Sequence, residues 1–125
     1  MASAAGFRVR RVYDPPEAAD GVRVLVDRLW PRGLSKERAA LDDWPKELTP
    51  SAELRTRYHR GQLDYPEFAL QYRAELAGPE PMAALRRLSE LARTATVTLL
   101  TAVQDPDRSH VTVLVEQLDR SAPEQ

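Results

Sequence analysis

Charged and aromatic side chains follow directly on an apolar run in the stretch VLVDRLWPRG, residues 24–33. Arg28 and Arg32 lie four residues apart here, and guanidinium groups hold phosphate or carboxylate through paired N–H donors. Trp30 offers a flat wall for a base or a ring. An ion pair with Asp27 would orient Arg28 and still leave it spare N–H donors. The stretch therefore predicts an anion-binding site where a buried strand leaves its sheet.

A second polar group, QDPDRSH at residues 104–110, follows another apolar run. Asp105 and Ser109 are both candidate helix caps, and a helix N-terminus favours a bound anion. If Ser109 is the cap, the helix dipole keeps His110 neutral, which suits a base or a hydrogen-bond acceptor. Because parallel neighbouring strands end at the same edge of a sheet, we expect the two polar groups to share one cleft. The residues expected to converge there are Asp27, Arg28, Arg32 and His110.

The candidate site residues divide by role. His110 and Asp27 are the best candidates for catalysis, although the sequence assigns no reaction to them. The ligand-binding candidates are Arg28, Trp30, Arg32, Gly33, Ser109 and His110. A purely structural interpretation is equally open: Asp27 and Arg28 would pair with each other or with loop backbone, Trp30 would belong to the core, and residues 31–33 would form a plain turn.

Several reaction classes lack the residues they need. The chain contains no cysteine, which excludes thiol nucleophiles and thiolate metal ligands. Ser109 beside His110 does not make a catalytic triad, because neighbours in the chain need not face each other. Asp27, His59 and His110 could give a metal two histidines and a carboxylate, but the two histidines lack compact spacing. We therefore expect no metal and no cofactor.

Three strands are expected from the apolar pattern: FRVRRVY at residues 7–13, VRVLVD at 22–27 and TVTLLTAV at 96–103. Between the first two, Asp14 begins a short helical turn that Gly21 closes. Residues 111–118 fit a helical stripe and also alternate as a strand would. The acidic cap before them and the mixed charges after them favour a helix.

Helices are expected between the second and third strands. Residues 34–44 contain a short one, and the next begins with Thr49 as its N-cap and Pro50 at its first position. Phe68, Tyr72 and Leu76 lie four apart, which predicts a helix that Gly78 and Pro79 end. A further helix covers residues 81–93. These apolar stripes most often face a core.

The order of elements predicts an α/β protein: a small single domain with a mostly parallel sheet of three or four strands flanked by helices. The short link between the first two strands leaves a hairpin-like pairing open as well. The 125 residues suit one domain, with residues 1–6 as a disordered N-terminus, 7–120 as the α/β domain and 121–125 as a frayed C-terminus.

Composition limits the partners and the compartment. The net charge is −1, so the chain is not a polycation, and only two of its 18 basic residues, Lys36 and Lys46, are lysines. No apolar stretch is long enough to span a bilayer, and no signal peptide is recognised. The lack of cysteine fits a reducing compartment. We expect a cytoplasmic protein, monomer or homodimer, that does not bind membranes.

Most of the chain resembles a known family. The stretches RVYDP and DGVRVLVDRLWPRG, followed by KELTPS, QYRAEL, TLL and a late His, are similar to the YeaO-like branch of the domain-of-unknown-function family 488. The resemblance implies a small cytosolic bacterial α/β protein of unassigned activity. The shared motif covers Asp27, Arg28, Trp30, Pro31, Arg32 and Gly33 and, more weakly, Lys46, Ser51, His59 and His110.

The chain departs from that family pattern at the third strand's exit. Thr101, Ala102, Val103 and Gln104 stand where the pattern has Tyr-Ser-Ala-Lys, and Ser109 stands where it has Asn. A mechanism that uses that Tyr or Lys as a proton donor therefore lacks its residue here.

Three functions remain at this point. The preferred one is binding of an anionic small molecule that bears phosphate or carboxylate. The first alternative is a nucleic-acid-associated module that places arginines on phosphates. The residues it would use are Arg8, Arg10, Arg28, Arg32, Arg55, Arg57 and Arg60. The second is a non-catalytic interaction protein in which Trp30 and Trp44 cover a dimer face.

Overall fold

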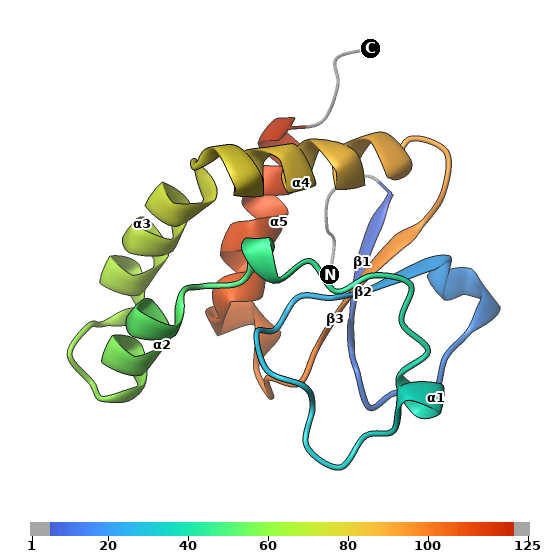
Figure 1. The fold of residues 1–125 in the computed structure, drawn as a ribbon, viewed down its shortest axis with the longest axis horizontal. Coiled ribbons are helices and arrows are strands. Elements are labelled where there is room, and N and C mark those ends of the chain that lie inside the picture. Colours follow the sequence, from blue (N-terminus) through green and yellow to red (C-terminus); the bar gives the residue numbers. More distant parts are fainter. Residues whose placement is uncertain (1–5, 122–125) are drawn as a thin grey trace.

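The protein is built on a three-stranded parallel sheet. The computed structural model describes residues 6–121, and its strands are β1 (Phe7–Arg11), β2 (Val22–Leu25) and β3 (Val97–Thr101). The strand order is β1-β3-β2, with β3 hydrogen-bonded to both neighbours (Figure 1). The predicted α/β class and parallel sheet are confirmed. The hairpin-like pairing of the first two strands is wrong, because β3 lies between them.

The register brings the carboxyl ends of the strands to one edge. Arg11 lies opposite Thr101, and Leu25 lies opposite Leu100. The chain stays in contact with β3 for one residue more on each side, since the amide of Val12 donates to Thr101 and the amide of Val26 donates to Leu100. The loops that follow the three strands therefore all begin at the same edge of the sheet.

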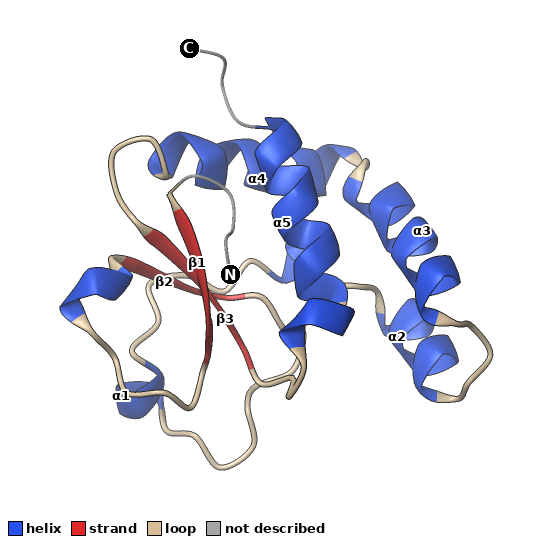
Figure 2. Cartoon of the chain, turned by 180° about the vertical axis from the view of Figure 1, so that it is seen from behind, coloured by secondary structure: helices blue, strands red, loops and turns tan. Residues whose placement is uncertain are grey.

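Five α-helices complete the described part of the chain: α1 (Lys36–Ala39), α2 (Ala52–His59), α3 (Tyr65–Leu76), α4 (Pro79–Leu91) and α5 (His110–Ser121). Three short 3-10 turns, η1 (Ala18–Asp20), η2 (Lys46–Leu48) and η3 (Pro106–Arg108), lie between them. Residues 111–118 are helical, as the charge pattern favoured. Figure 2 shows α4 and α5 beside the sheet and α2 with α3 beyond them.

The start of α2 differs from the prediction. Ser51, not Thr49, is the N-cap: its Oγ accepts from the amide of Leu54 and donates to a carboxylate oxygen of Glu75. The Thr49 hydroxyl donates instead to the carbonyl of Lys46 at the end of η2. Both residues can cap a helix locally, and Glu75 of α3, distant in sequence, stabilises the later start.

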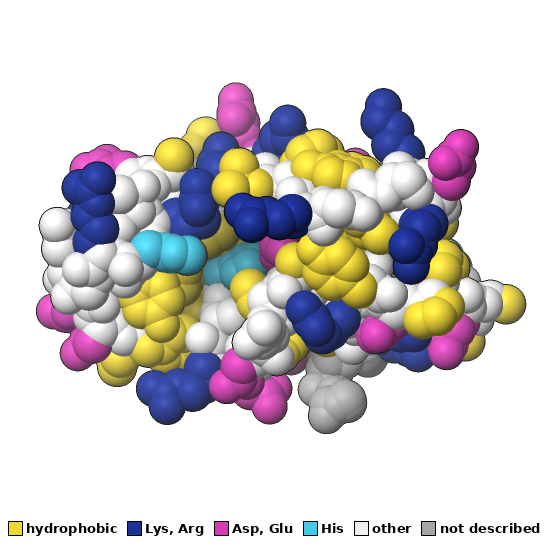
Figure 3. Space-filling model, turned by 90° about the horizontal axis from the view of Figure 1, so that it is seen from below, with side chains coloured by type: hydrophobic (Ala, Val, Ile, Leu, Met, Phe, Trp, Pro, Cys, Tyr) yellow, Lys and Arg dark blue, Asp and Glu magenta, His cyan; other side chains and the backbone are white. Residues whose placement is uncertain are grey.

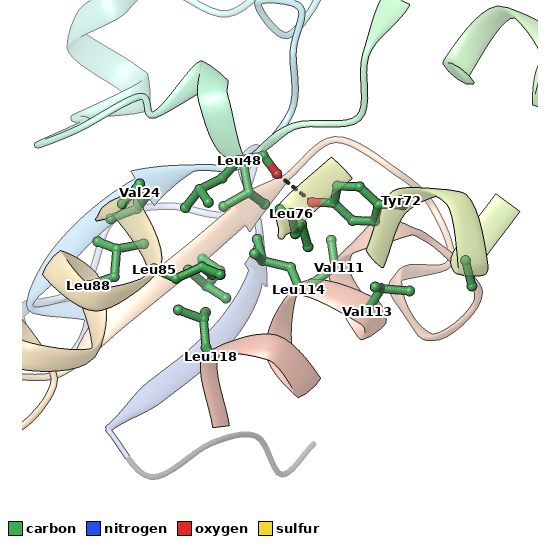
Figure 4. Packing of buried hydrophobic residues seen from close by; sticks show 14 of the residues in the cluster. Val24, Leu48, Tyr72, Leu76, Leu85, Leu88, Val111, Val113, Leu114 and Leu118 are labelled. Carbon is green, nitrogen blue, oxygen red and sulfur yellow. Dashed lines mark hydrogen bonds between the residues drawn. The ribbon is translucent and has the colours of Figure 1, made fainter. Parts of the chain in front are cut away.

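The main core lies between one face of the sheet and α3, α4 and α5. Val24 of β2 and Leu99 of β3 belong to this core together with Leu88 of α4 and Leu118 of α5. Tyr72 of α3 donates its hydroxyl to the carbonyl of Leu48 (Figure 4). A smaller cluster covers the opposite face, where residues 34–44 pack on the sheet. Its buried members are Val12, Leu25, Leu34, Ala39 and Leu100. The sheet is thus covered on both faces, as expected for parallel strands.

A buried ion cluster ties η1 to the sheet. The Asp20 side chain is fully buried and faces the guanidinium groups of Arg10, 2.9 Å away, and Arg23, 2.5 Å away. Burial alone would raise the pKa of Asp20, but hydrogen bonds from the Glu17 amide and from these arginines hold it below its ordinary value. Arg8 lies 3.2 Å from the same carboxylate. These arginines of β1 and β2 are therefore occupied inside the protein.

The predicted disordered ends lie almost entirely outside the described residues. Residues 1–5 and 122–125 are not described. Gly6 is a turn residue with φ of 84°, and its carbonyl accepts from the amide of Val97. A Cβ at Gly6 would lie 2.5 Å from the carbonyl oxygen of Ala92, so the turn before β1 requires glycine.

Candidate functional site

The carboxyl ends of the three strands open into one pocket of about 560 Å³. The strand exits contribute Tyr13, Asp27, Arg28, Leu29, Trp30, Pro31, Arg32, Ala102 and Val103. The helical segments contribute Pro50, Arg55, Tyr58, His59, Phe68, Asp105, Arg108, Ser109 and His110. Figure 3 looks onto this hollow, with histidine in it, Lys and Arg side chains around it, and apolar side chains on part of its wall.

Asp27 is held at the base of the pocket by β3. One carboxylate oxygen accepts from the Thr101 hydroxyl at 2.7 Å, and the other accepts from the amide of Ala102 at 2.8 Å. Burial alone would raise the pKa of Asp27, but the hydrogen bonds from His110, Ala102 and Thr101, together with the charge interaction with His110, hold it below its ordinary value. The residue that replaces the family's Tyr, Thr101, thus serves to position this carboxylate.

His110 is the second fixed group of the pocket floor. Its Nε2 lies 2.8 Å from the carbonyl oxygen of Val26 and 3.2 Å from Oδ1 of Asp27. A carbonyl oxygen only accepts, so Nε2 carries a hydrogen. Among residues 6–121 no hydrogen-bond partner is found for Nδ1, so Nδ1 is the ring nitrogen left for a ligand.

Ser109 caps α5 and orients His110. Its Oγ accepts from the amide of Val111 at 3.1 Å and donates to the carbonyl of Pro106 at 2.8 Å. The carbonyl of Ser109 accepts from the hydroxyl of Tyr65 on α3. Of the two candidate caps, Ser109 caps α5 through its side chain, whereas Asp105 precedes η3 without a side-chain capping hydrogen bond.

Arg28 is held by backbone and not by Asp27. Its Nε donates to the carbonyl of Pro50 at 2.9 Å, which leaves both Nη groups free of that bond. The hypothesis that Asp27 orients Arg28 is therefore wrong, because the Asp27 oxygens already accept from β3 and His110. The carbonyl that does orient Arg28 lies just before α2, and that contact depends on how α2 is placed.

The two tryptophans are engaged within the protein. Trp30 donates its indole N–H to the carbonyl of Leu34 at 2.6 Å, and Trp44 donates to the carbonyl of Asp27 at 2.7 Å. Their rings meet edge to face with centroids 5.4 Å apart. The amine of Lys46 lies 4.2 Å from the centre of the Trp44 ring, outside the pocket lining. Trp30 therefore offers the pocket ring carbons and not its N–H.

Four arginines and two aspartates line the pocket. Within residues 6–121, no carboxylate forms a salt bridge with the four arginines, Arg28, Arg32, Arg55 and Arg108. The Nε of Arg55 is buried and has no hydrogen-bond partner among the described residues. A buried N–H without an acceptor is costly, so this donor is expected to bind either water or a ligand.

The structure brings most of the predicted ligand-binding residues together. Arg28, Trp30, Arg32, Ser109 and His110 line the pocket, and Gly33 does not. Gly33 is an exposed turn residue with φ of 77°, and a Cβ added there would meet nothing within 4 Å. Sequence reasoning missed Tyr13, Arg55, Tyr58 and Arg108 as lining residues. Arg55 and Tyr58 are spaced as one helical face, and that spacing was the only available signal.

The described residues contain neither a metal-binding cluster nor a membrane-spanning helix. Asp27, His59 and His110 line the same pocket, but no group of three His, Asp or Glu side chains in residues 6–121 could hold a metal ion. No helix in that range combines the length and apolar character needed to cross a bilayer.

Comparison with known proteins gives relatives over almost the whole chain. A family model described as "Inactive DUF488-N3 subclade" matches residues 6–125. The chain is 48% identical over 112 residues to the "Uncharacterized protein YeaO" of Escherichia coli K12, covering 90% of this chain and 96% of that protein. It is 42% identical over 112 residues to the "Uncharacterized protein Rv3073c" of Mycobacterium tuberculosis H37Rv, covering 90% and 92%. No solved structure matches it significantly.

Proposed function

The chain belongs to the DUF488 family, as a relative of YeaO, and from that premise we propose that its strand-end pocket binds an anionic small molecule bearing phosphate or carboxylate. The observation that carries the proposal is the set of four pocket arginines without a carboxylate partner among the described residues. Guanidinium groups in a concave site are the usual means of holding such anions.

Each arginine is suited to this role in a different way. Arg28 is anchored through Nε, so its remaining N–H groups are pre-oriented at little entropic cost. Arg55 has a buried Nε that needs an acceptor. Arg32 and Arg108 are exposed side chains of the lining, where they attract an approaching anion and can bind it through paired N–H donors. The ligand would therefore meet an oriented donor at Arg28 and exposed donors at Arg32 and Arg108.

The pocket floor favours binding over catalysis. Both oxygens of Asp27 already accept hydrogen bonds and its pKa is held below the ordinary value, so the carboxylate is a weaker base and nucleophile than a free one. His110 has its Nε2–H committed to Val26, and it can offer Nδ1 as an acceptor to a ligand hydroxyl or amide. The description of the matching subclade as inactive supports the same view. We propose that this binding takes place in the bacterial cytoplasm.

The arrangement of the other arginines supports a small ligand over nucleic acid. Arg8 and Arg10 face Asp20 and Glu17, and Arg57 donates to Gln71. A surface that binds the phosphate backbone of a nucleic acid would need such arginines free to contact successive phosphates. Arg28, Arg32 and Arg55, three other arginines of the set considered for nucleic acid, line one pocket instead of following a track.

The proposal is tested by thermal shift and calorimetry with a panel of phosphates, carboxylates and nucleotides at constant ionic strength. Arg32→Ala removes an exposed pocket arginine, and the matched control Arg86→Ala removes an exposed arginine of α4 outside the pocket lining. A charged bidentate contact contributes about 1.5–3 kcal/mol, so Arg32→Ala should weaken binding about tenfold or more while Arg86→Ala leaves it unchanged.

Two results would refute the proposal. One is that no anion of the panel stabilises the unmodified protein. The other is that the protein binds only long nucleic acid with a steep dependence on salt, which would favour a nucleic-acid-associated module. An equal loss of affinity in Arg32→Ala and Arg86→Ala would show that binding depends on the overall charge of the protein and not on this pocket.

A further inference from the structure

We propose that the bound anion also carries a planar aromatic ring, which lies against a wall formed by Tyr58 and Trp30. This inference rests on the proposed anion site and names the class of its ligand: an aryl or nucleoside phosphate or carboxylate. The evidence is the aromatic composition of the pocket wall, its distance from the arginines, and the volume of the pocket.

The wall is aromatic and pre-formed. Tyr58 stacks on Phe68 with ring centroids 4.4 Å apart and planes within 16°, so its ring is held by the core on one side. It is only half-buried and lines the pocket. Among the described residues no partner is found for the Tyr58 hydroxyl, which leaves it for the ligand or for water.

Trp30 adds apolar surface to the same pocket lining. The indole N–H of Trp30 is already used on Leu34, so its ring presents carbon to the pocket. Pro31 and Pro50 also line the pocket. A hydrated phosphate gains nothing from such surface, whereas a flat ring gains both burial and stacking.

The ring wall and the cations lie within the reach of one small molecule. Arg55 and Tyr58 are three residues apart in α2, so they share a face with an axial rise of about 4.5 Å between them. Arg28 is tied to Pro50, just before the same helix. An anionic group at Arg28 and Arg55 therefore places a ring attached through a short linker beside Tyr58.

The volume agrees with a ligand of this size. Pockets for small organic ligands and cofactors are about 300–1,000 Å³, and this one is about 560 Å³. An inorganic phosphate or a short carboxylate would fill a small fraction of it and leave the aromatic wall in contact with water. An aryl or nucleoside phosphate would cover that wall.

The test compares three anions by calorimetry at constant ionic strength: inorganic phosphate, cyclohexyl phosphate and phenyl phosphate. Cyclohexyl and phenyl phosphate share charge and approximate size, and only the second has a flat aromatic face. We expect phenyl phosphate to bind about tenfold more tightly than the other two, because stacking on a protein ring is worth about that factor or more. This comparison uses the unmodified protein and needs no variant.

A matched pair of variants assigns the preference to the wall. Tyr58→Leu keeps an apolar side chain but removes the ring, and should reduce the preference for phenyl phosphate to about threefold or less without changing the affinity for inorganic phosphate. Tyr58→Phe keeps the ring and should keep the preference. An unchanged preference in a folded Tyr58→Leu protein would overturn the inference.

The outcomes separate this inference from the anion site itself. Equal affinity for the three anions would overturn the aromatic inference while the anion site stands. Failure of all three to bind, together with no binding by the nucleotides and carboxylates of the earlier panel, would overturn both.

Discussion

Replacement of Asp27 by Asn tests whether the charge at the pocket floor stabilises the fold. The carboxylate accepts from the Thr101 hydroxyl at 2.7 Å and the Ala102 amide at 2.8 Å, and lies 3.2 Å from Nε2 of His110. In the best arrangement of the introduced side-chain amide, its oxygen would face the Ala102 N–H and its NH₂ would face Thr101, whose hydroxyl can turn to accept. The Nε2–H of His110 would then lose its contact with residue 27 and would donate only to the carbonyl of Val26.

The cost can be estimated from these contacts. A hydrogen bond to a charged group contributes about 1.5–3 kcal/mol and a neutral one about 0.5–1.5 kcal/mol. At the lower ends of these ranges, two contacts that become neutral lose about 1 kcal/mol each and the third loses about 1.5 kcal/mol, so the unfolding free energy should fall by about 3.5 kcal/mol at pH 7. With an unfolding entropy of about 2.1 cal/mol/K per residue, a chain of this length should lose about 13 °C in melting temperature.

The effect should depend on pH with a definite sign. Because the pKa of Asp27 is held below its ordinary value of 3.8, the folded state gains from ionisation above that pH and loses the gain as pH falls through the lowered value. The difference between the unmodified protein and Asp27→Asn should therefore shrink below about pH 4, where the protonated acid resembles the amide. Urea unfolding followed by circular dichroism from pH 7 to pH 3 measures this.

The control is Asp119→Asn, an exposed position of α5, which should change the unfolding free energy by less than about 0.5 kcal/mol. The reasoning is refuted if Asp27→Asn is as stable as the unmodified protein at pH 7. It is also refuted if the difference stays constant down to pH 3, since the carboxylate charge would then contribute nothing.

Two further predictions concern the frame of the site, and both are read by urea unfolding. Gly21→Ala should lower the unfolding free energy by about 2 kcal/mol or more, because φ is 63° there and a Cβ would lie 2.3 Å from the carbonyl oxygen of Thr96; Gly33→Ala, with positive φ but open space, should cost about 1 kcal/mol. Equal losses of unfolding free energy in Gly21→Ala and Gly33→Ala would contradict the predicted clash with Thr96. Tyr72→Phe should cost about 1–3 kcal/mol, because it leaves the buried carbonyl of Leu48 without its donor. Tyr13→Phe, at an exposed hydroxyl, should be near neutral, and a near-neutral Tyr72→Phe would show that water replaces the lost donor.

The location of the site could be predicted because it depends on local patterns and one general rule. Asp27 and the loop before His110 each follow an apolar strand, and parallel strands end at one edge. The helices were recognisable for the same reason, since Phe68, Tyr72 and Leu76 keep the helical period and are buried. Patterns of this kind span a few residues and need no knowledge of the partner segment.

The contacts that define the site could not be predicted, because each joins segments distant in sequence. Arg28 meets Pro50 and not its neighbour Asp27. Arg55 and Tyr58 enter the pocket from α2, whose position depends on its packing against α3. Tyr13 follows β1, which pairs with the central strand β3, and so it also lines the pocket. The strand patterns in the sequence did not show this strand order.

The central position of β3 has a consequence for synthesis on the ribosome. Phe7 of β1 and Val22 of β2 both pair with Val97, so two strands leave the ribosome long before the strand that joins them. Thr101, Ala102 and His110, which hold Asp27, arrive in the same late segment. Sheet and pocket are therefore completed in one late event, and folding is governed by long-range pairing, which slows it. Until then the nascent chain has helices to form but no sheet of its own.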